Sequence, residues 1–304
     1  MKECAVIGGG IGGLSAAILI ASSKLCKVNL HEQNDHAGGK AGTLSMNKFR
    51  FDTGPTLLTL DFVLEEFFAS AGVSMDDYLT LRKLDTNCVY YYPDGMVFSA
   101  YTDPKKLEEE TSGKMGMDPL LLRRYRNYCK RIYDLAADIF LFGSFHEMDS
   151  LMSHDPGKIL PHLNRLDPFR TMHQANKSFF KDRRLVQLFD RYATFVGSNP
   201  YRVPATLNVI QHVEQLGAYV PAGGVHDIPR ALCRLAEEKG VKINYNSKVT
   251  EICTTGKRID GIIVNREKKK ADFVVSNADV RTTYCDLLGD RSSPDSLKYR
   301  ILEP

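Results

Sequence analysis

The stretch Ala5-Val6-Ile7-Gly8-Gly9-Gly10-Ile11-Gly12-Gly13-Leu14 decides the fold of this chain. It continues a short apolar run over residues 4–7, whose β-branched side chains are typical of a buried parallel strand. Three of the glycines that follow, Gly8, Gly10 and Gly13, have the spacing G-x-G-x-x-G. This spacing indicates a tight turn that leads from a strand into a helix.

A helix and a second strand follow at the distances that a dinucleotide-binding unit requires. Residues 14–21 are rich in Ala, Leu and Ile and predict the helix, and residues 26–31 predict the strand. Glu32 ends that strand, 19 residues after Gly13. A carboxylate at this place accepts hydrogen bonds from a ribose 2′-OH and disfavours a 2′-phosphate, which argues against NADP. A glycine-rich turn of another fold is the alternative, but the complete pattern favours dinucleotide binding.

Each position of the fingerprint has a physical role. Gly8 lets the chain turn out of the strand, Gly10 removes the Cβ that would keep a pyrophosphate from the backbone, and Gly13 lets the helix lie close to the sheet. The free N–H groups at the helix start carry partial positive charge and bind phosphates. We therefore predict that five residues contact the cofactor here: Gly8, Gly10, Ile11, Gly12 and Gly13.

The composition is that of an ordinary globular protein and excludes several classes of function. Of the 304 residues, 43% are hydrophobic and 25% are charged, which argues against disorder. The net charge of +3 is too small to indicate nucleic-acid binding. The seven cysteines form no C-x-x-C pair, and the eight histidines form no H-x-x-x-H pattern. We therefore expect reduced thiols in a cytoplasmic protein, without a disulfide framework or a metal site.

The order of the predicted elements indicates an α/β protein in which a nucleotide-binding domain is interrupted by a mainly helical one. Asp103-Pro104 and Asp118-Pro119 are helix starts, and strands return after residue 240. We predict that residues 1–85 and 217–304 form the two parts of the nucleotide-binding domain. Residues 86–216 then form a substrate- and membrane-associating domain that is largely helical and contains a β-hairpin.

The helix that starts at Asp118-Pro119 has an apolar stripe and a basic remainder. The basic residues are Arg123, Arg124, Arg126, Lys130 and Arg131. Such a face beside apolar surface suits an anionic membrane surface, and a solvated basic face is the alternative. We find no signal peptide and no run of about 18 apolar residues, so we expect no membrane-spanning segment.

The residues after Glu32 indicate which dinucleotide is bound. Gly38-Gly39-Lys40 comes next, then a hairpin-like stretch over residues 44–51, then Asp52-Thr53-Gly54-Pro55-Thr56. This arrangement resembles the FAD-binding family of amine oxidases, protoporphyrinogen oxidases and carotenoid desaturases. The resemblance implies a Rossmann-type domain of the glutathione-reductase-like, amine-oxidase-like kind. It also implies that Gly39 and Lys40 lie by the FAD phosphates, and that Gly54, Pro55 and Thr56 lie near the flavin ring.

Further blocks resemble the phytoene desaturase type of carotenoid desaturase, in the same order and at similar spacing. They are residues 51–56, Phe195-Val196-Gly197-Ser198-Asn199-Pro200, Pro221-Ala222-Gly223-Gly224 and Ser276-Asn277-Ala278-Asp279-Val280. A strand that begins at Val249 also matches, and the resemblance implies that main-chain atoms of Val249 hold the adenine. Members of this family run on well beyond residue 304 and carry another glycine-rich block that completes the flavin pocket. We therefore expect an N-terminal fragment with the C-terminal part missing.

The implied activity is desaturation of a carotenoid precursor, a phytoene-like polyene, by hydride transfer to FAD. Asp190 and Arg191 form a polar pair among apolar residues, either facing a cavity or as a structural ion pair, and we assign no catalytic residue. The lipophilic substrate implies a cytoplasmic protein that associates peripherally with membranes. The oligomeric state is not predicted.

Two other classes remain open. One is another flavin oxidase of the same fold, of the amine oxidase or protoporphyrinogen oxidase type. The other is a non-enzymatic relative like the Rab GDP-dissociation inhibitors, which share the fold and bind prenylated proteins. The fingerprint, Glu32 and Gly38-Gly39-Lys40 favour a true FAD site over the second of these classes.

Overall fold

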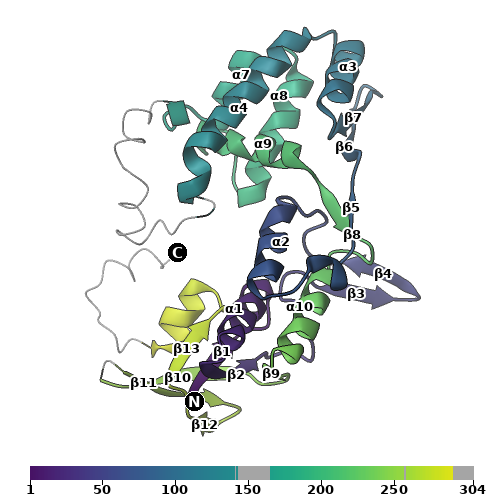
Figure 1. Cartoon of the computed structure of the whole chain (residues 1–304). Coiled ribbons are helices and arrows are strands. Elements are labelled where there is room, and N and C mark those ends of the chain that lie inside the picture. Colours follow the sequence, from purple (N-terminus) through teal and green to yellow (C-terminus); the bar gives the residue numbers. More distant parts are fainter. Residues whose placement is uncertain (141, 143–164, 257, 290–304) are drawn as a thin grey trace. The chain divides into compact units, whose positions relative to one another are not determined.

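A parallel sheet of four strands carries the glycine fingerprint at the end of its first strand (Figure 1). In the computed structural model the strand order is β13 (Phe273–Ser276), β1 (Lys2–Ile7), β2 (Cys26–His31) and β9 (Lys242–Asn244). Every ladder in this sheet is parallel, so strands from both ends of the sequence share it. The predicted α/β class is confirmed.

The chain divides into two units, and the structure describes residues 1–140, 142, 165–256 and 258–289. Unit 1 consists of Met1–Arg82 and Val220–Pro304, and unit 2 is Lys83–Tyr219. The chain passes from one unit to the other at β5 (Leu81–Lys83) and β8 (Tyr219–Pro221), which pair in a two-stranded sheet. The assignment of cofactor binding to the outer segments and substrate binding to the inner one stays a prediction. The expected unfinished end of the chain lies outside the described residues.

Two helices cover one face of the parallel sheet, α1 (Ile11–Ser22) and α10 (Asp227–Glu238). Leu14 and Ile18 of α1 and Leu232 of α10 are fully buried in one core with Val6 and Leu30 of the sheet. The helix predicted over residues 14–21 is confirmed, but it begins earlier because the glycines after Ile11 already have helical conformation.

An antiparallel meander covers the other face of the sheet. Its strands are β10 (Val249–Thr255), β11 (Arg258–Val264) and β12 (Glu267–Lys269). Ala5 and Ile7 pack against Val249 and Ile262 of the meander, whereas Val6 points to the helices. Both faces of β1 are therefore buried, which explains why its sequence is apolar without alternation.

The rest of unit 1 consists of a hairpin and short helices. They are β3 (Thr43–Met46), β4 (Phe49–Asp52), α2 (Asp61–Ser70), the 3₁₀ helix η1 (Met75–Asp77) and the π-helix η5 (Thr282–Leu287). The hairpin expected over residues 44–51 is thus confirmed.

Unit 2 is a helical assembly with one hairpin. Its elements are β6 (Thr86–Tyr91), β7 (Val97–Tyr101), α3 (Pro104–Met115), α4 (Pro119–Phe140), α7 (Met172–Phe179), α8 (Arg183–Asp190), η3 (Arg191–Val196), η4 (Ala205–Asn208) and α9 (Val209–Leu216). Tyr125, Tyr128 and Ile132 of α4 are buried in its core, so the apolar stripe of this helix faces inward. No helix in the described part of the chain is long and apolar enough to cross a bilayer.

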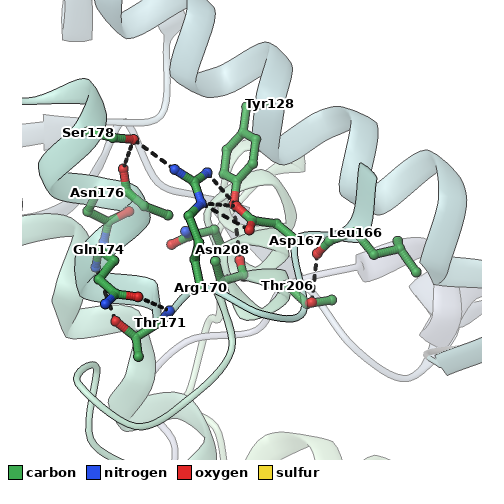
Figure 2. A network of polar contacts seen from close by, with 12 residues as sticks. Tyr128, Leu166, Asp167, Arg170, Thr171, Gln174, Asn176, Ser178, Thr206 and Asn208 are labelled. Atoms are coloured by element: carbon green, nitrogen blue, oxygen red, sulfur yellow. Dashed lines mark hydrogen bonds and ion pairs between the residues drawn. The ribbon is translucent and has the colours of Figure 1, made fainter. Parts of the chain in front are cut away.

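Polar side chains join the helices of unit 2 (Figure 2). The Tyr128 hydroxyl donates to the Asp167 carboxylate over 2.8 Å, and the Arg170 guanidinium binds the same carboxylate and the Ser178 hydroxyl. Burial raises the pKa of Asp167, but the bonds from Arg170 and Tyr128 outweigh this and hold that pKa below its ordinary value. The carboxylate therefore stays charged and links α4 to the chain just before α7.

The close approach of α1 to β1 generates the first prediction. A Cβ added to Gly13 would lie 2.0 Å from the Gly8 carbonyl oxygen, a contact that the backbone cannot relieve locally. We expect Gly13→Ala to destabilise the protein by about 2–4 kcal/mol, because helix and strand must separate. Urea unfolding measures this change.

The matched control is Gly113→Ala in α3, where an added Cβ meets no atom of the described part of the chain within 4 Å. This change should stabilise the protein by up to about 1 kcal/mol, because Ala favours helix interiors. Equal effects of the two substitutions would contradict the packing argument.

Candidate functional site

Residues 8–10 of the fingerprint form a loop where β1 ends and α1 begins, and we call this loop the cradle. Gly8 has a φ of +94°, and its N–H donates to the His31 carbonyl over 2.8 Å. Gly10 is the N-cap residue of α1, and no side chain among the described residues caps the first N–H groups of the helix. These N–H groups are therefore available to an anionic ligand.

The second glycine segment lies directly against the first. The Gly38 N–H donates to the Gly9 carbonyl over 2.9 Å, and a Cβ on Gly39 would come within 3.2 Å of the Gly10 Cα. A Cβ on Gly54 would lie 1.7 Å from the Lys40 carbonyl oxygen. The fold therefore brings Gly39 against Gly10 of the fingerprint and Lys40 into its surroundings, while Gly54 packs on Lys40.

Glu32, which we predicted to bind a ribose hydroxyl, also fixes the loop after β1. Its side chain is buried, and Oε2 accepts from the Gly9 N–H over 2.7 Å. Oε1 accepts two bonds from Asn34, one from the backbone N–H and one from the side-chain amide. Oε2 keeps a lone pair that can accept one further hydrogen bond, such as one from a hydroxyl.

Two cavities meet at Gly8 and Glu32. One, of about 580 Å³, extends toward β10 and is lined by Val249 among others. The other, of about 490 Å³, follows the glycine segments and is lined by Gly10, Ile11, Gly39, Lys40 and Pro55. Together they form an elongated site with the cradle in the middle, which suits a dinucleotide.

Four predicted residues do not line either cavity. Gly12 and Gly13 lie beneath the cradle, where their missing side chains leave room for Asn277 and for the Gly8 carbonyl. Gly54 packs on Lys40, and Thr56 is exposed. Their predicted contacts with a cofactor stay predictions.

Asn277 belongs to the site although we did not predict a role for it. Its N–H donates to the Ile7 carbonyl over 2.8 Å at the end of β13. Its side chain lies against the cradle, since a Cβ on Gly12 would lie 2.6 Å from Oδ1 and one on Gly10 would lie 2.9 Å from Nδ2. The signal available in the sequence was an Asn directly after the predicted strand at residues 273–276, because the carboxyl ends of parallel strands meet at one edge of a sheet.

Comparison with known proteins gives the family. A family model described as flavin containing amine oxidoreductase matches residues 11–294. The chain belongs to this family. A 1-hydroxycarotenoid 3,4-desaturase from Flavobacterium sp. (strain P99-3) is 33% identical over 296 residues, which cover 97% of this chain and 60% of the relative. A 4,4′-diaponeurosporene oxygenase from Staphylococcus aureus (strain USA300) is 34% identical over 286 residues, 93% of this chain and 57% of the relative.

The likeness extends to solved structures. An oxidoreductase from Methanosarcina mazei aligns with a TM-score of 0.67 at 19% identity, covering 99% of this chain and 64% of that one, which shows the shared fold. The predicted resemblance to carotenoid desaturases and the predicted FAD cofactor are confirmed at the level of the family. The chain spans about 60% of the length of the curated relatives that it matches.

The described residues fit FAD. The uncapped start of α1 and the exposed Lys40 are suited to a diphosphate, and Oε2 of Glu32 to a ribose hydroxyl. Lys40 makes no ion pair with another described residue, so its charge is free for a phosphate. Within the described ranges, no group of three or more His, Cys, Asp or Glu side chains is arranged to hold a metal ion.

His31 lies in the wall of the larger cavity and is almost completely buried. Burial, and then the charges of Lys269 and Lys242, lower the pKa of His31 from 6.5 to about 4. The imidazole is therefore neutral in the folded protein at pH 7, and its Nδ1 has no hydrogen-bond partner among the described residues.

The predicted polar pair Asp190 and Arg191 is not a pair. Asp190 binds the His173 ring over 2.7 Å and the Asn176 amide over 2.8 Å, both on α7. Arg191 binds the buried Glu214 carboxylate at 3.0 Å. Consecutive side chains at the end of α8 point in different directions, so each finds a partner on another helix. Both residues hold unit 2 together.

The position of Asn277 predicts an effect on cofactor affinity. Asn277→Asp adds a negative charge beside the phosphate cradle and should weaken FAD binding at least about tenfold, because like charges repel. Fluorescence titration with FAD measures the affinity. The control is Asn47→Asp, the same change on the exposed turn between β3 and β4, which should leave affinity unchanged. Equal FAD affinities of the wild type, Asn277→Asp and Asn47→Asp would show that Asn277 does not belong to the site.

Burial of neutral His31 predicts a pH dependence of stability. The unfolded chain takes up a proton near pH 6.5, whereas the folded chain does so only near pH 4. Stability therefore falls as the pH drops through this window, by roughly 1–2 kcal/mol between pH 7 and pH 5. Urea unfolding at both pH values should show this loss in the wild type and less of it in His31→Asn. The same pH dependence in both proteins would contradict the assignment.

Proposed function

We propose that this chain binds FAD and belongs to an enzyme that oxidises a carotenoid-type polyene at a CH–CH bond. The observation that carries the proposal is the cradle in which Gly10, Gly39 and Glu32 converge beside an uncapped helix start. The names of the two relatives, a carotenoid desaturase and a carotenoid oxygenase, support the substrate class.

Each part of the site has a task in this proposal. The first N–H groups of α1 and the Lys40 ammonium bind the diphosphate, and Glu32 accepts a ribose hydroxyl. Main-chain atoms of Val249 hold the adenine in the larger cavity. Residues Gly54, Pro55 and Thr56 lie toward the flavin ring, where tight packing of Gly54 on Lys40 fixes the loop.

The chemistry is the cofactor's, and the protein supplies position. Bound FAD would supply the hydride acceptor for an allylic carbon, and loss of a proton from the neighbouring carbon would leave a C=C bond between the two carbons. Asp190 and Arg191 are engaged in structural bonds, so neither is assigned as the proton acceptor.

Oxygenation of the same polyene is the second candidate, since one relative is named as an oxygenase. Other flavin oxidases of the family act through the same cofactor, so only the substrate distinguishes them. A non-enzymatic role like that of the Rab GDP-dissociation inhibitors would not need the phosphate cradle.

The purified protein tests the proposal in two steps. Flavin absorption bands in the protein, present on isolation or after addition of FAD, are the expected result, with weaker retention in Asn277→Asp. Anaerobic addition of a carotene in lipid vesicles should then bleach the flavin, whereas an amine should not. Mass spectrometry of the product distinguishes loss of two hydrogens from gain of oxygen. Absence of flavin even after addition of FAD, in this chain and in a form extended to the length of its relatives, would overturn the proposal.

A further inference from the structure

The β3–β4 hairpin has one apolar and one polar face. In its register Leu44 is opposite Phe51 and Met46 is opposite Phe49, so these four side chains share a face. Thr43, Ser45, Arg50 and Asp52 lie on the other face.

The polar face is the one that attaches to the protein. The Arg50 guanidinium donates to the Gly223 carbonyl, and the Asp52 carboxylate accepts from the Val225 N–H over 3.0 Å. Both partners belong to the segment that leads into α10 in unit 1. A hairpin on a soluble protein normally packs its apolar face on the core, and this one is inverted.

The apolar face is consequently open to solvent. The exposed fractions are 52% for Leu44, 56% for Met46, 68% for Phe49 and 51% for Phe51. The two phenylalanine rings lie 6.4 Å apart, so the face is continuous. Contiguous apolar surface of this kind marks a place where a partner binds.

The charged residues at the tip of this hairpin are positive, and its one acid, Asp52, lies on the polar face, where it accepts from the Val225 N–H. From residue 37 to residue 51 the sequence has no Asp or Glu and contains Lys40, Lys48 and Arg50. Asn47 and Lys48 form the tight turn with positive φ, which brings Lys48 beside Phe49 at the tip of the hairpin. A cation next to exposed aromatic and aliphatic side chains complements the headgroups and the acyl boundary of an anionic bilayer.

The basic face of α4 was our first candidate for membrane contact, but most of its side chains bind other residues of unit 2. Arg123 and Arg126 both bind Glu108, and Lys130 binds Asp134. Arg131 lies over the Tyr128 ring. Such pairing lowers the charge that this helix offers to a surface.

We propose that the β3–β4 hairpin is the membrane-docking element, and that it inserts Met46, Phe49 and their neighbours into an anionic bilayer with Lys48 at the headgroups. This inference rests on the proposed function, because a polyene substrate resides in the bilayer. Docking of the hairpin beside the predicted flavin-ring segment, residues 54–56, would bring the site to its substrate.

The absence of Trp from the sequence provides a direct test. Phe49→Trp gives a single reporter at an exposed position, and Tyr91→Trp, at a position 78% exposed in unit 2, is the matched control. We expect vesicles of phosphatidylglycerol and phosphatidylcholine to shift the tryptophan emission of Phe49→Trp to the blue and brominated lipids to quench it. The emission of Tyr91→Trp should not change. Neither signal requires FAD or turnover, so failure of docking and failure of the proposed function are distinguishable.

Sedimentation with the same vesicles measures affinity. Phe49→Glu should weaken binding about tenfold or more, and Lys48→Gln about fivefold. Arg124→Glu on α4 should have little effect, and thermal unfolding verifies that each variant is folded. Unchanged emission of Phe49→Trp with vesicles would overturn the proposal. A blue shift that instead depends on protein concentration without lipid would overturn it in favour of a second copy of the chain.

Discussion

The hydrogen bond from the Gly9 N–H to the Glu32 carboxylate joins the ends of β1 and β2, and the site depends on it. It fixes the loop after β1 against the residue that follows β2, while the same carboxylate fixes Asn34. The bond forms only because Gly8 takes a positive φ and Gly13 leaves room for the Gly8 carbonyl. One buried carboxylate and two missing side chains therefore determine where a phosphate can lie.

Much of this arrangement could be predicted because it is local. The strand, glycine turn, helix and acid occur within 32 residues, and each has a fixed geometric role. The hairpin after Lys40 is likewise local, and it forms over the residues for which it was predicted. The start of α1 was harder to predict. Glycine has a low helix propensity, so tertiary packing decides whether a glycine takes helical conformation.

What could not be predicted depends on contacts between distant segments. Asn277 reaches the cradle only because β13 pairs with β1, and no local pattern specifies that pairing. Asp190 and Arg191 are adjacent in sequence and looked like a pair, yet their partners lie on α7 and α9. A buried polar group without a hydrogen-bond partner costs free energy. Each of these side chains therefore bonds to a partner that the tertiary structure places within reach.

The pairing of β1 with β13 has a consequence for biosynthesis. The Glu3 N–H donates to the Asp272 carboxylate across 269 residues of sequence. At ribosomal rates, roughly 15 to 50 seconds separate the synthesis of these two residues. Unit 2 is a continuous segment and can fold during that interval. In contrast, β1 lacks its partner strand β13 until residues 273–276 have been synthesised. The cradle is thus among the last parts of the described chain to form, and the nascent chain exposes an apolar first strand until then.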